Sequence, residues 1–554
     1  MQQQSTFGNI MFHFFGWPGA IYRLFAGTGR YPLITYLVWL QVFTTIGATV
    51  NSIHQGHGYA LGEWAGTFLV AAVAGSLLTH VRQDSWWRWL TWCPMFFKTD
   101  RFYTWADGAG NVSNNDVLRG STVEDTTKNR PASTHSANPS TIHIGGVAID
   151  PTTEVQHILI GGTTGSGKTQ AINGIYRTIR ERNQAAIVAD VGGGFLSTFG
   201  RPKSTDLVLN PFDARDAGWN PYLEIHSPYD AARLAKSTIA DGTGEGEQWT
   251  KFAQYMLSAV LQKQKQTGDT SVRRLLYLMN EAPAQELAET LAGTRAAVLT
   301  QPGNERMLSN TRVTAAPSME AWDYLADDGT FSIRDWVRAV AEEDYDGWLF
   351  LPYRDDQAPL LRPLISTWCD IALVEGLALD ESPHRRVWFG LDEVDSLGKV
   401  NSLKDGLTKL RKRGGSVVAA LQAISQARTT YGDGLAETIL ANFSTRLVMR
   451  CPDGPTAKYF EEELGTQEVR RFVENRSTGS STSAGLRMGS STASSNSGET
   501  EQRLTQATVL ASEIQGLPDL TGYLTAPSSP IRKVKIEYQK MPETMPTFIP
   551  KSEG

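Results

Sequence analysis

Apolar residues follow three different patterns along this chain of 554 residues. In residues 1–100 they form long uncharged runs, and in residues 228–345 they recur at helical spacing. Elsewhere, short apolar runs of strand length alternate with helical segments. Strands that alternate with helices are typical of a parallel sheet covered by helices. We therefore predict an α/β fold with a mostly parallel sheet, interrupted by an all-α insertion domain.

Residues 1–100 have the composition of a membrane anchor. Residues 31–50 (YPLITYLVWLQVFTTIGATV) contain no charge, and at about 1.5 Å per residue such a helix spans a hydrocarbon core of roughly 30 Å. Residues 64–79 are also uncharged and, extended back to Tyr59, predict a second span. Lys and Arg flank the pair on its outer sides, which places both chain ends in the cytoplasm of a bacterial inner membrane. The alternative is a buried helical hairpin. Residues 101–140 are polar and predict a linker.

A phosphate-binding loop is the strongest chemical signal. Residues 162–169 read GTTGSGKT and fit the pattern G-x-x-x-x-G-K-[ST], between an apolar strand and a helix. Glycines let backbone N–H groups turn toward a polyphosphate, Lys reaches the β- and γ-phosphates, and Thr ligates Mg²⁺. A glycine turn that happens to precede a helix is the alternative. The candidate residues for ATP are Gly162, Thr163, Thr164, Gly165, Ser166, Gly167, Lys168 and Thr169.

The other predicted strands determine where we place the domain boundaries. Apolar runs at residues 185–190, 206–213 and 347–353 predict further strands of one sheet, and the helical block lies between the last two. We predict a nucleotide-binding domain from residues 141–227 and 346–554, and an all-α domain from residues 228–345.

An acidic pair ends a further strand. Residues 387–391 are apolar and are followed by Asp392 and Glu393, an arrangement in which a strand-end acid holds the magnesium shell and its neighbour polarises water. Adjacent strand residues point to opposite sides, so the two carboxylates have different roles. We assign Asp392 to Mg²⁺ and Glu393 to the general base.

Two polar features surround the next strand, residues 416–421. Arg411, Lys412 and Arg413 precede it, either as solvated charges at a helix end or as a source of an arginine finger for a neighbouring subunit, from Arg411 or Arg413. Gln422 follows it, either as an ordinary strand-end residue or as a contact to the γ-phosphate and the attacking water.

The end of the chain and the overall composition add less. Residues 475–498 are rich in Ser, Thr and Gly and predict a mobile loop or a linker, and residues 522–524 and 534–538 predict edge strands. A formal net charge of −6 gives no general basic field, so any nucleic-acid surface must be local.

Taken together, these motifs resemble the type IV secretion coupling proteins, and within them the TraD/TrwB-like conjugative branch. The resemblance is carried by the membrane hairpin, EVQHILIGGTTGSGKT, LNPFDARDAGWNP, LDEVDSL and LTKLRKRGGSVVAALQ. It implies a RecA-like P-loop NTPase that forms a homo-hexamer at the inner membrane. Such a protein recruits relaxase-bound, single-stranded DNA and passes it to channel proteins. The resemblance also implies Lys168 and Thr169 for nucleotide, Asp392 and Glu393 as the acidic pair, Arg411 as finger and Gln422 as sensor.

Two other functions fit the same motifs. One is a nucleotide-gated receptor or scaffold for secreted proteins, and the other is a HerA/FtsK-like translocase acting on duplex DNA. A winged-helix module at the carboxyl end would favour the translocase, and the sequence shows none.

Overall fold

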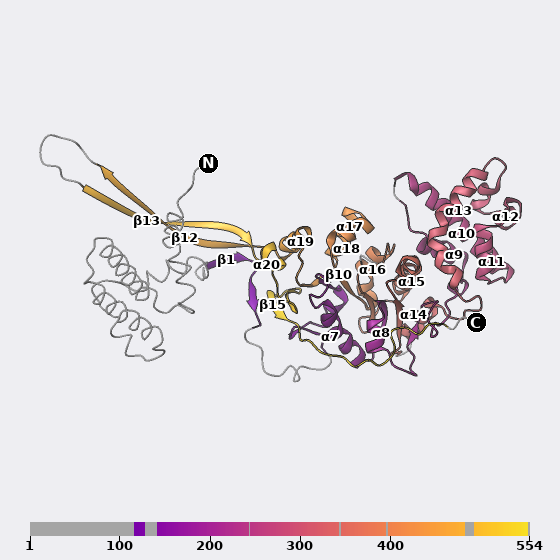
Figure 1. Cartoon of the computed structure of the whole chain (residues 1–554), viewed down its shortest axis with the longest axis horizontal. Coiled ribbons are helices and arrows are strands. Elements are labelled where there is room, and N and C mark those ends of the chain that lie inside the picture. The colour runs from indigo at the N-terminus through magenta and orange to yellow at the C-terminus, as the bar shows by residue number, and fades with distance from the viewer. Residues whose placement is uncertain are drawn as a thin grey trace, which may run out of the picture. The chain divides into compact units, whose positions relative to one another are not determined.

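The computed structural model describes residues 116–127, 141–242, 244–342, 345–394, 397–481 and 492–551 (Figure 1). All of them belong to the unit that spans Asn114–Gly554. The predicted membrane anchor, residues 1–100, and most of the predicted linker lie outside the described residues. Among the helices that the structure describes, none is both long enough and apolar enough to cross a bilayer.

A ten-stranded sheet organises the described part of the chain, with the order β2-β15-β14-β11-β5-β10-β9-β6-β8-β7. Seven neighbouring strands, from β11 to β7, are parallel, and β14 joins them antiparallel at β11. The predicted mostly parallel sheet is confirmed. Its strands are β2 (Val123–Asp125), β5 (Ile158–Gly161), β6 (Ala185–Val191), β7 (Leu207–Val208), β8 (Trp348–Tyr353), β9 (Val387–Leu391), β10 (Gly415–Leu421), β11 (Thr445–Val448), β14 (Thr521–Thr525) and β15 (Ile531–Lys535).

Both faces of this sheet are covered, which explains why the central strands β5, β9 and β10 are buried at every position. In β9, Trp388 packs into the core beneath α7 (Lys168–Glu181) and α8 (Gly194–Phe199), while Phe389 packs into the core on the other face. The second face is covered by α15 (Ala358–Ala378), α16 (Leu403–Lys409), α17 (Ile424–Tyr431), α18 (Asp433–Ala441) and α19 (Gly454–Leu464).

Between β7 and β8, the long described elements are all helices. They are α9 (Pro228–Thr238), α10 (Glu247–Thr267), α11 (Val272–Asn280), α12 (Ala284–Leu291), α13 (Glu305–Met319) and α14 (Ile333–Glu342). Figure 1 shows α10–α13 gathered at one end of the unit. The hydrophobic core of the second sheet face continues into these helices, since Met256 and Trp322 belong to the same buried cluster as Phe389. The domain boundaries therefore stay a prediction.

The expected mobile loop at residues 475–498 is wrong over part of its length. Strands β12 (Thr466–Ser481) and β13 (Thr492–Ala507) pair antiparallel through residues 475–481 and 492–498. A strand pair satisfies its main-chain groups without an apolar face, so hydrophobic periodicity gave no signal here. Strand β1 (Asp116–Gly120) extends the ribbon, and the remaining small elements are β3 (His143–Ile144), β4 (Val147–Ala148) and α20 (Ala511–Gln515).

The carboxyl-terminal segment, residues 536–551, crosses α7 and α8 and is drawn in yellow in Figure 1. The N–H of Thr544 donates to the carbonyl of Ser197 in α8 at 2.7 Å. Farther on, the N–H of Ala214 donates to the carbonyl of Ile549 at 2.7 Å. The segment is therefore tied to the nucleotide domain at both ends of its path.

Candidate nucleotide site of the sheet edge

The phosphate loop is held between the two strands that flank β5. The N–H of Gly162 donates to the carbonyl of Leu421, at the end of β10, at 3.0 Å. The N–H of Thr163 donates to the carbonyl of Arg450, just after β11, at 2.8 Å. The carboxyl ends of parallel strands lie at the same end of the sheet. The loop is anchored there by β10 on one side and by the residues after β11 on the other.

The loop has the backbone of an anion cradle. Gly165 and Gly167 have φ values of +77° and +112°, which residues with a Cβ rarely adopt. Thr164 and Thr169 are exposed, so a ligand has open access to the loop and to the first turn of α7. The Nζ of Lys168 lies back over the loop and donates to the carbonyl of Gly162 at 2.7 Å. No side chain caps α7, which leaves its positive dipole end to the ligand. These features fit a nucleoside polyphosphate.

The acidic pair lies across β10 from this loop. Strand β10 pairs with β5 on one side and with β9 on the other, so the loop, the acids and the end of β10 share one edge. Glu393 has a φ of 59°, an uncommon conformation for a non-glycine residue that turns the chain out of β9. The Nε2 of Gln422 donates to Oε1 of Glu393, so the structure brings together the two side chains predicted as sensor and base.

Asp190 is a third acid at this edge, at the end of β6. It is fully buried, and its carboxylate accepts the N–H groups of Phe195 at 3.2 Å and Leu196 at 2.7 Å. Burial, with a smaller contribution from the nearby charge of Asp392, raises the pKa of Asp190 to about 7, although the N–H groups that donate to its carboxylate act in the opposite direction. Because both oxygens hold the start of α8, Asp190 has a structural role.

The chain matches a family model described as the type IV secretion-system coupling protein DNA-binding domain over residues 141–537. This match covers more than half of the sequence. The chain belongs to the type IV secretion-system coupling protein family.

Individual relatives agree with this assignment. This family member is 32% identical to coupling protein TraD of Escherichia coli (strain K12) over 417 residues, which are 74% of this chain and 57% of TraD. It is 24% identical to protein VirD4 of Rhizobium radiobacter over 344 residues, which are 56% of this chain and 48% of VirD4. The chain thus spans about half the length of these curated relatives.

Solved structures show the same fold. Plasmid coupling protein TrwB in complex with the non-hydrolysable ATP analogue ADPNP matches with a TM-score of 0.69 and 32% identity, covering 80% of this chain and 99% of TrwB. TrwB in complex with ADP and Mg²⁺ matches with a TM-score of 0.67 and 32% identity, covering 78% of this chain and 98% of TrwB. The α/β, RecA-like fold expected of this family member is confirmed.

Arg411 lies near the amino ends of the parallel strands, whereas the phosphate loop lies at their carboxyl ends. Arg411 precedes β10, whose seven residues at about 3.3 Å each separate the two ends by roughly 20 Å. Its side chain is exposed, whereas Arg413 is half-buried and its Nε donates to the carbonyl of Leu379 at 2.9 Å. Arg411 therefore cannot reach the phosphates of its own subunit, and it is freer than Arg413 to reach those of another.

Two contacts at the site were not visible in the sequence of this family member. The carbonyl of Arg450 receives the loop N–H of Thr163, and the N–H of Leu520 donates to the carbonyl of Ser166 at 2.8 Å. Both are main-chain contacts made by residues about 290 or more positions away in sequence, so no local pattern predicts them. Leu520 has a φ of 60°, a strained value that marks a constrained position.

Proposed function

We propose that this coupling protein is a membrane-anchored, homo-hexameric ATPase that recruits relaxase-bound DNA and drives it into a type IV secretion channel. The observation that carries the proposal is the meeting of three motifs at one sheet edge. The phosphate loop follows β5, the acidic pair follows β9, and Gln422 at the end of β10 joins them through Glu393. TraD and TrwB, which this chain resembles over most of its described length, are coupling proteins.

ATP and Mg²⁺ fit the residues at this edge. The loop from Gly162 to Thr169 would hold the phosphates, with Lys168 at their β- and γ-groups. Thr169 and Asp392 would hold Mg²⁺, which neutralises charge on the phosphate oxygens when it is bound. Glu393 would take a proton from the attacking water. Gln422 orients the Glu393 carboxylate through the bond between their side chains.

The position of Arg411 supports a proposal of hydrolysis between subunits. The exposed Arg411 lies near the amino ends of the strands, away from its own phosphate loop. A ring of subunits would therefore present it to the γ-phosphate of a neighbour. A finger supplied in this way raises rates by about 10³–10⁵ in other phosphate-transfer enzymes. Mixing Arg411→Ala subunits with Lys168→Ala subunits should restore some activity, because some interfaces then combine two intact halves.

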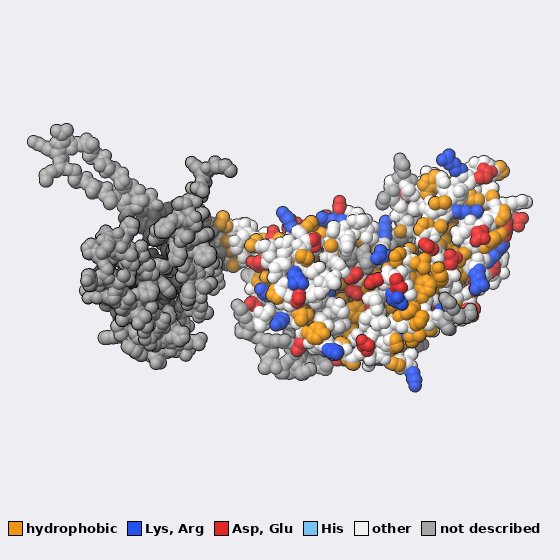
Figure 2. All heavy atoms as spheres, in the orientation of Figure 1, with side chains coloured by type: hydrophobic (Ala, Val, Ile, Leu, Met, Phe, Trp, Pro, Cys, Tyr) orange, Lys and Arg blue, Asp and Glu red, His pale blue; other side chains and the backbone are white. Residues whose placement is uncertain are grey.

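DNA binding requires a local basic surface, since the chain has a net charge of −6. On the face drawn in Figure 2, basic and acidic side chains are interspersed. Three lysines after β9 are candidates for contact with DNA. Lys399 donates to the carbonyl of Asp241 at 3.1 Å and Lys409 pairs with Asp405 at 2.9 Å. Lys404 is exposed. We assign the anchor to residues 1–100 and relaxosome docking to the helices of residues 228–345.

The proposal is tested with full-length protein in detergent and with transfer in cells. Wild-type protein should hydrolyse ATP, and DNA should stimulate the rate. Lys168→Ala should abolish both hydrolysis and conjugative transfer. If Lys168→Ala still supports transfer, nucleotide serves only to lock a receptor or scaffold, and the motor is excluded. Identification of the bound cargo in cells separates DNA from secreted protein.

A further inference from the structure

The carboxyl-terminal segment passes beside the phosphate loop and carries an exposed aromatic ring. Tyr538 is 66% exposed. A single exposed tyrosine needs no explanation by itself, so its position relative to the loop decides what it can do. The residues around it fix that position.

Main-chain and side-chain bonds hold both flanks of Tyr538 against the nucleotide edge. On one side, the N–H of Ile536 donates to the carbonyl of Leu520 at 2.7 Å, and Leu520 in turn donates to Ser166 of the loop. On the other side, the N–H of Gln539 donates to Oε1 of Gln170, in the first turn of α7, at 3.0 Å. Tyr538 therefore lies within one residue of a contact to the helix that follows the loop.

The sheet order indicates which end of a nucleotide points this way. Glu393 and Gln422 lie on the β10 and β9 side of β5, so the γ-phosphate belongs there. The α-phosphate, ribose and base must then extend to the other side of β5, where β11 and β14 lie. That side holds Arg450, Leu520 and the segment with Tyr538. Tyr538 therefore lies on the side of the loop toward which the base would extend.

We propose that Tyr538 stacks on the purine base of the bound nucleoside triphosphate. This inference rests on the proposed function and names the residue that holds the base at the same site. Aromatic stacking is sequence-tolerant, because every base has a π-face, so the ring favours adenine and guanine alike. Leu520, whose side chain lies against Gly167, supplies an apolar surface beside the loop.

The test compares two ligands on full-length protein in detergent, by calorimetry. One ligand is the ATP analogue ADPNP, and the other is inorganic tripolyphosphate, which has the phosphates and no base. Tyr538→Ala should weaken ADPNP binding about 2- to 12-fold, the range expected for one aromatic contact, and leave tripolyphosphate unchanged. GDPNP should weaken by the same factor as ADPNP. Tyr538→Phe should bind all three ligands as wild type does.

A matched control variant keeps the test decisive. Tyr229, on α9, is 70% exposed and matches Tyr538 in type and exposure, so Tyr229→Ala should change no affinity. Equal weakening of ADPNP and tripolyphosphate in Tyr538→Ala would show a loop effect and overturn the proposal, as would no change in either. These are binding measurements, so they remain informative if the wild-type protein proves not to hydrolyse ATP, which would overturn the proposed function alone.

Discussion

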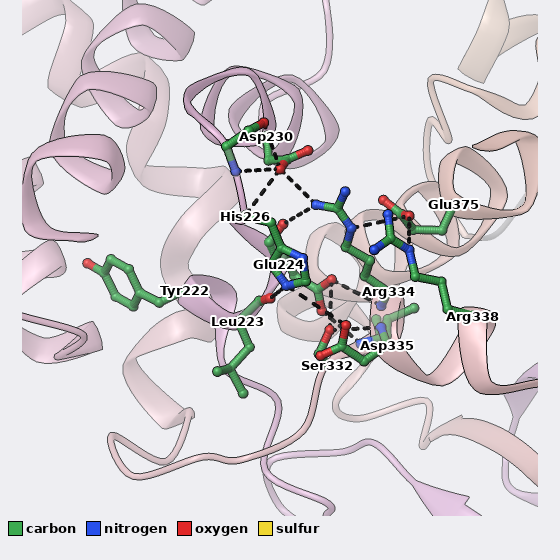
Figure 3. A network of polar contacts seen from close by, with 12 residues as sticks. Tyr222, Leu223, Glu224, His226, Asp230, Ser332, Arg334, Asp335, Arg338 and Glu375 are labelled. Atoms are coloured by element: carbon green, nitrogen blue, oxygen red, sulfur yellow. Dashed lines mark hydrogen bonds and ion pairs between the residues drawn. The ribbon is translucent and has the colours of Figure 1, made fainter. Parts of the chain in front are cut away.

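Two of the polar clusters among the described residues are built in opposite ways. At the nucleotide edge, Thr164 and Thr169 are exposed and Glu393 and Gln422 are half-buried. At the junction between α15 and the helical block, Glu375 is 0% exposed and faces three arginines. Figure 3 shows Glu375 beside Arg334 and Arg338. The first cluster is accessible to a ligand, whereas the second is enclosed.

The junction satisfies its own charges. Glu375 pairs with Arg233, with the Nε of Arg334 at 3.4 Å and with the Nε of Arg338 at 3.7 Å. Arg334 also pairs with Asp230 at 2.8 Å. Ionic groups arranged this way fix the position of α9 and α14 on α15, and Oε2 of Glu375 is held by ion pairs without a hydrogen bond. Burial thus separates this structural polar cluster from the candidate site.

The largest expected effect concerns the nucleotide edge. Glu393→Gln removes the proposed base and keeps an amide that can still contact Gln422. We expect the ATPase rate to fall by about 10²–10⁴, the usual contribution of a general base, with little change in thermal stability. Steady-state ATPase assays and a thermal unfolding scan measure the two quantities. ATP binding should persist, and its loss would mean that Glu393 holds the loop instead of acting on water.

At the junction, we expect a substitution to lower stability and to leave ATP binding unchanged. Glu375→Gln leaves the buried Arg334 and the half-buried Arg233 short of a counter-charge, and breaking a buried pair in this way costs about 3–5 kcal/mol of folding free energy. The affinity of the folded fraction for ATP should not change, since Glu375 lies outside the nucleotide edge. Thermal unfolding with and without ATP tests both statements.

A surface pair supplies the control for Glu375. Glu381 is 65% exposed and lies 3.8 Å from Lys412, so Glu381→Gln should leave the unfolding midpoint within experimental scatter. Equal destabilisation by Glu375→Gln and Glu381→Gln would contradict the structural role of the buried network.

The folding stability contributed by His157, at the amino end of β5, should depend on pH. His157 is buried, its Nδ1 accepts the N–H of Val417 at 3.0 Å and its Nε2 lies 2.8 Å from the carbonyl of Leu407, so the ring is neutral with the proton on Nε2. Burial lowers the pKa of His157 to about 4. The unfolded chain, with a pKa near 6.5, binds the proton more readily between these values, so stability is full above about pH 6.5 and falls as pH drops toward 4.

His157→Gln isolates this contribution. The stability difference between wild type and variant should shrink by about 3 kcal/mol from pH 7 to pH 4, because only the wild type gains a proton on unfolding at this position. Unfolding midpoints across that range provide the measurement. A difference that stays constant with pH would show that His157 is not buried in its neutral form.

Sequence patterns predicted the elements of this unit well where burial alone decides the structure. The run at residues 387–391 became β9 with the same bounds, and the strands expected at residues 185–190 and 347–353 formed as β6 and β8. The strand expected at residues 206–213 is limited to β7, because Asn210 turns the chain by accepting the N–H of Phe212 at 2.9 Å. Side-chain bonds of this kind compete with strand pairing and do not alter hydrophobic periodicity.

The site was predictable to the extent that it is local. The glycine pattern and the acids at the end of β9 identify chemistry within a few residues, and in the structure Gln422 donates to Glu393. The contacts of Leu520 and Gln539 with the loop region were not predictable, since they join residues more than 350 positions apart. The ion pairs of Glu375 were not predictable either, because its arginines come from two other helices.

The smallest expected effect tests whether the two clusters are independent. The segment after β9 touches the end of α9, where Nδ2 of Asn401 donates to the carbonyl of Lys236 at 2.8 Å. Asn401→Ala removes one hydrogen bond, which lowers stability by about 1 kcal/mol. Bound ATP stabilises by an amount set only by its concentration and affinity, so the shift in unfolding midpoint that ATP adds should equal that of wild type. A smaller shift in Asn401→Ala would mean that this contact carries energy from the helical block to the nucleotide edge, and the two regions would then be one coupled system.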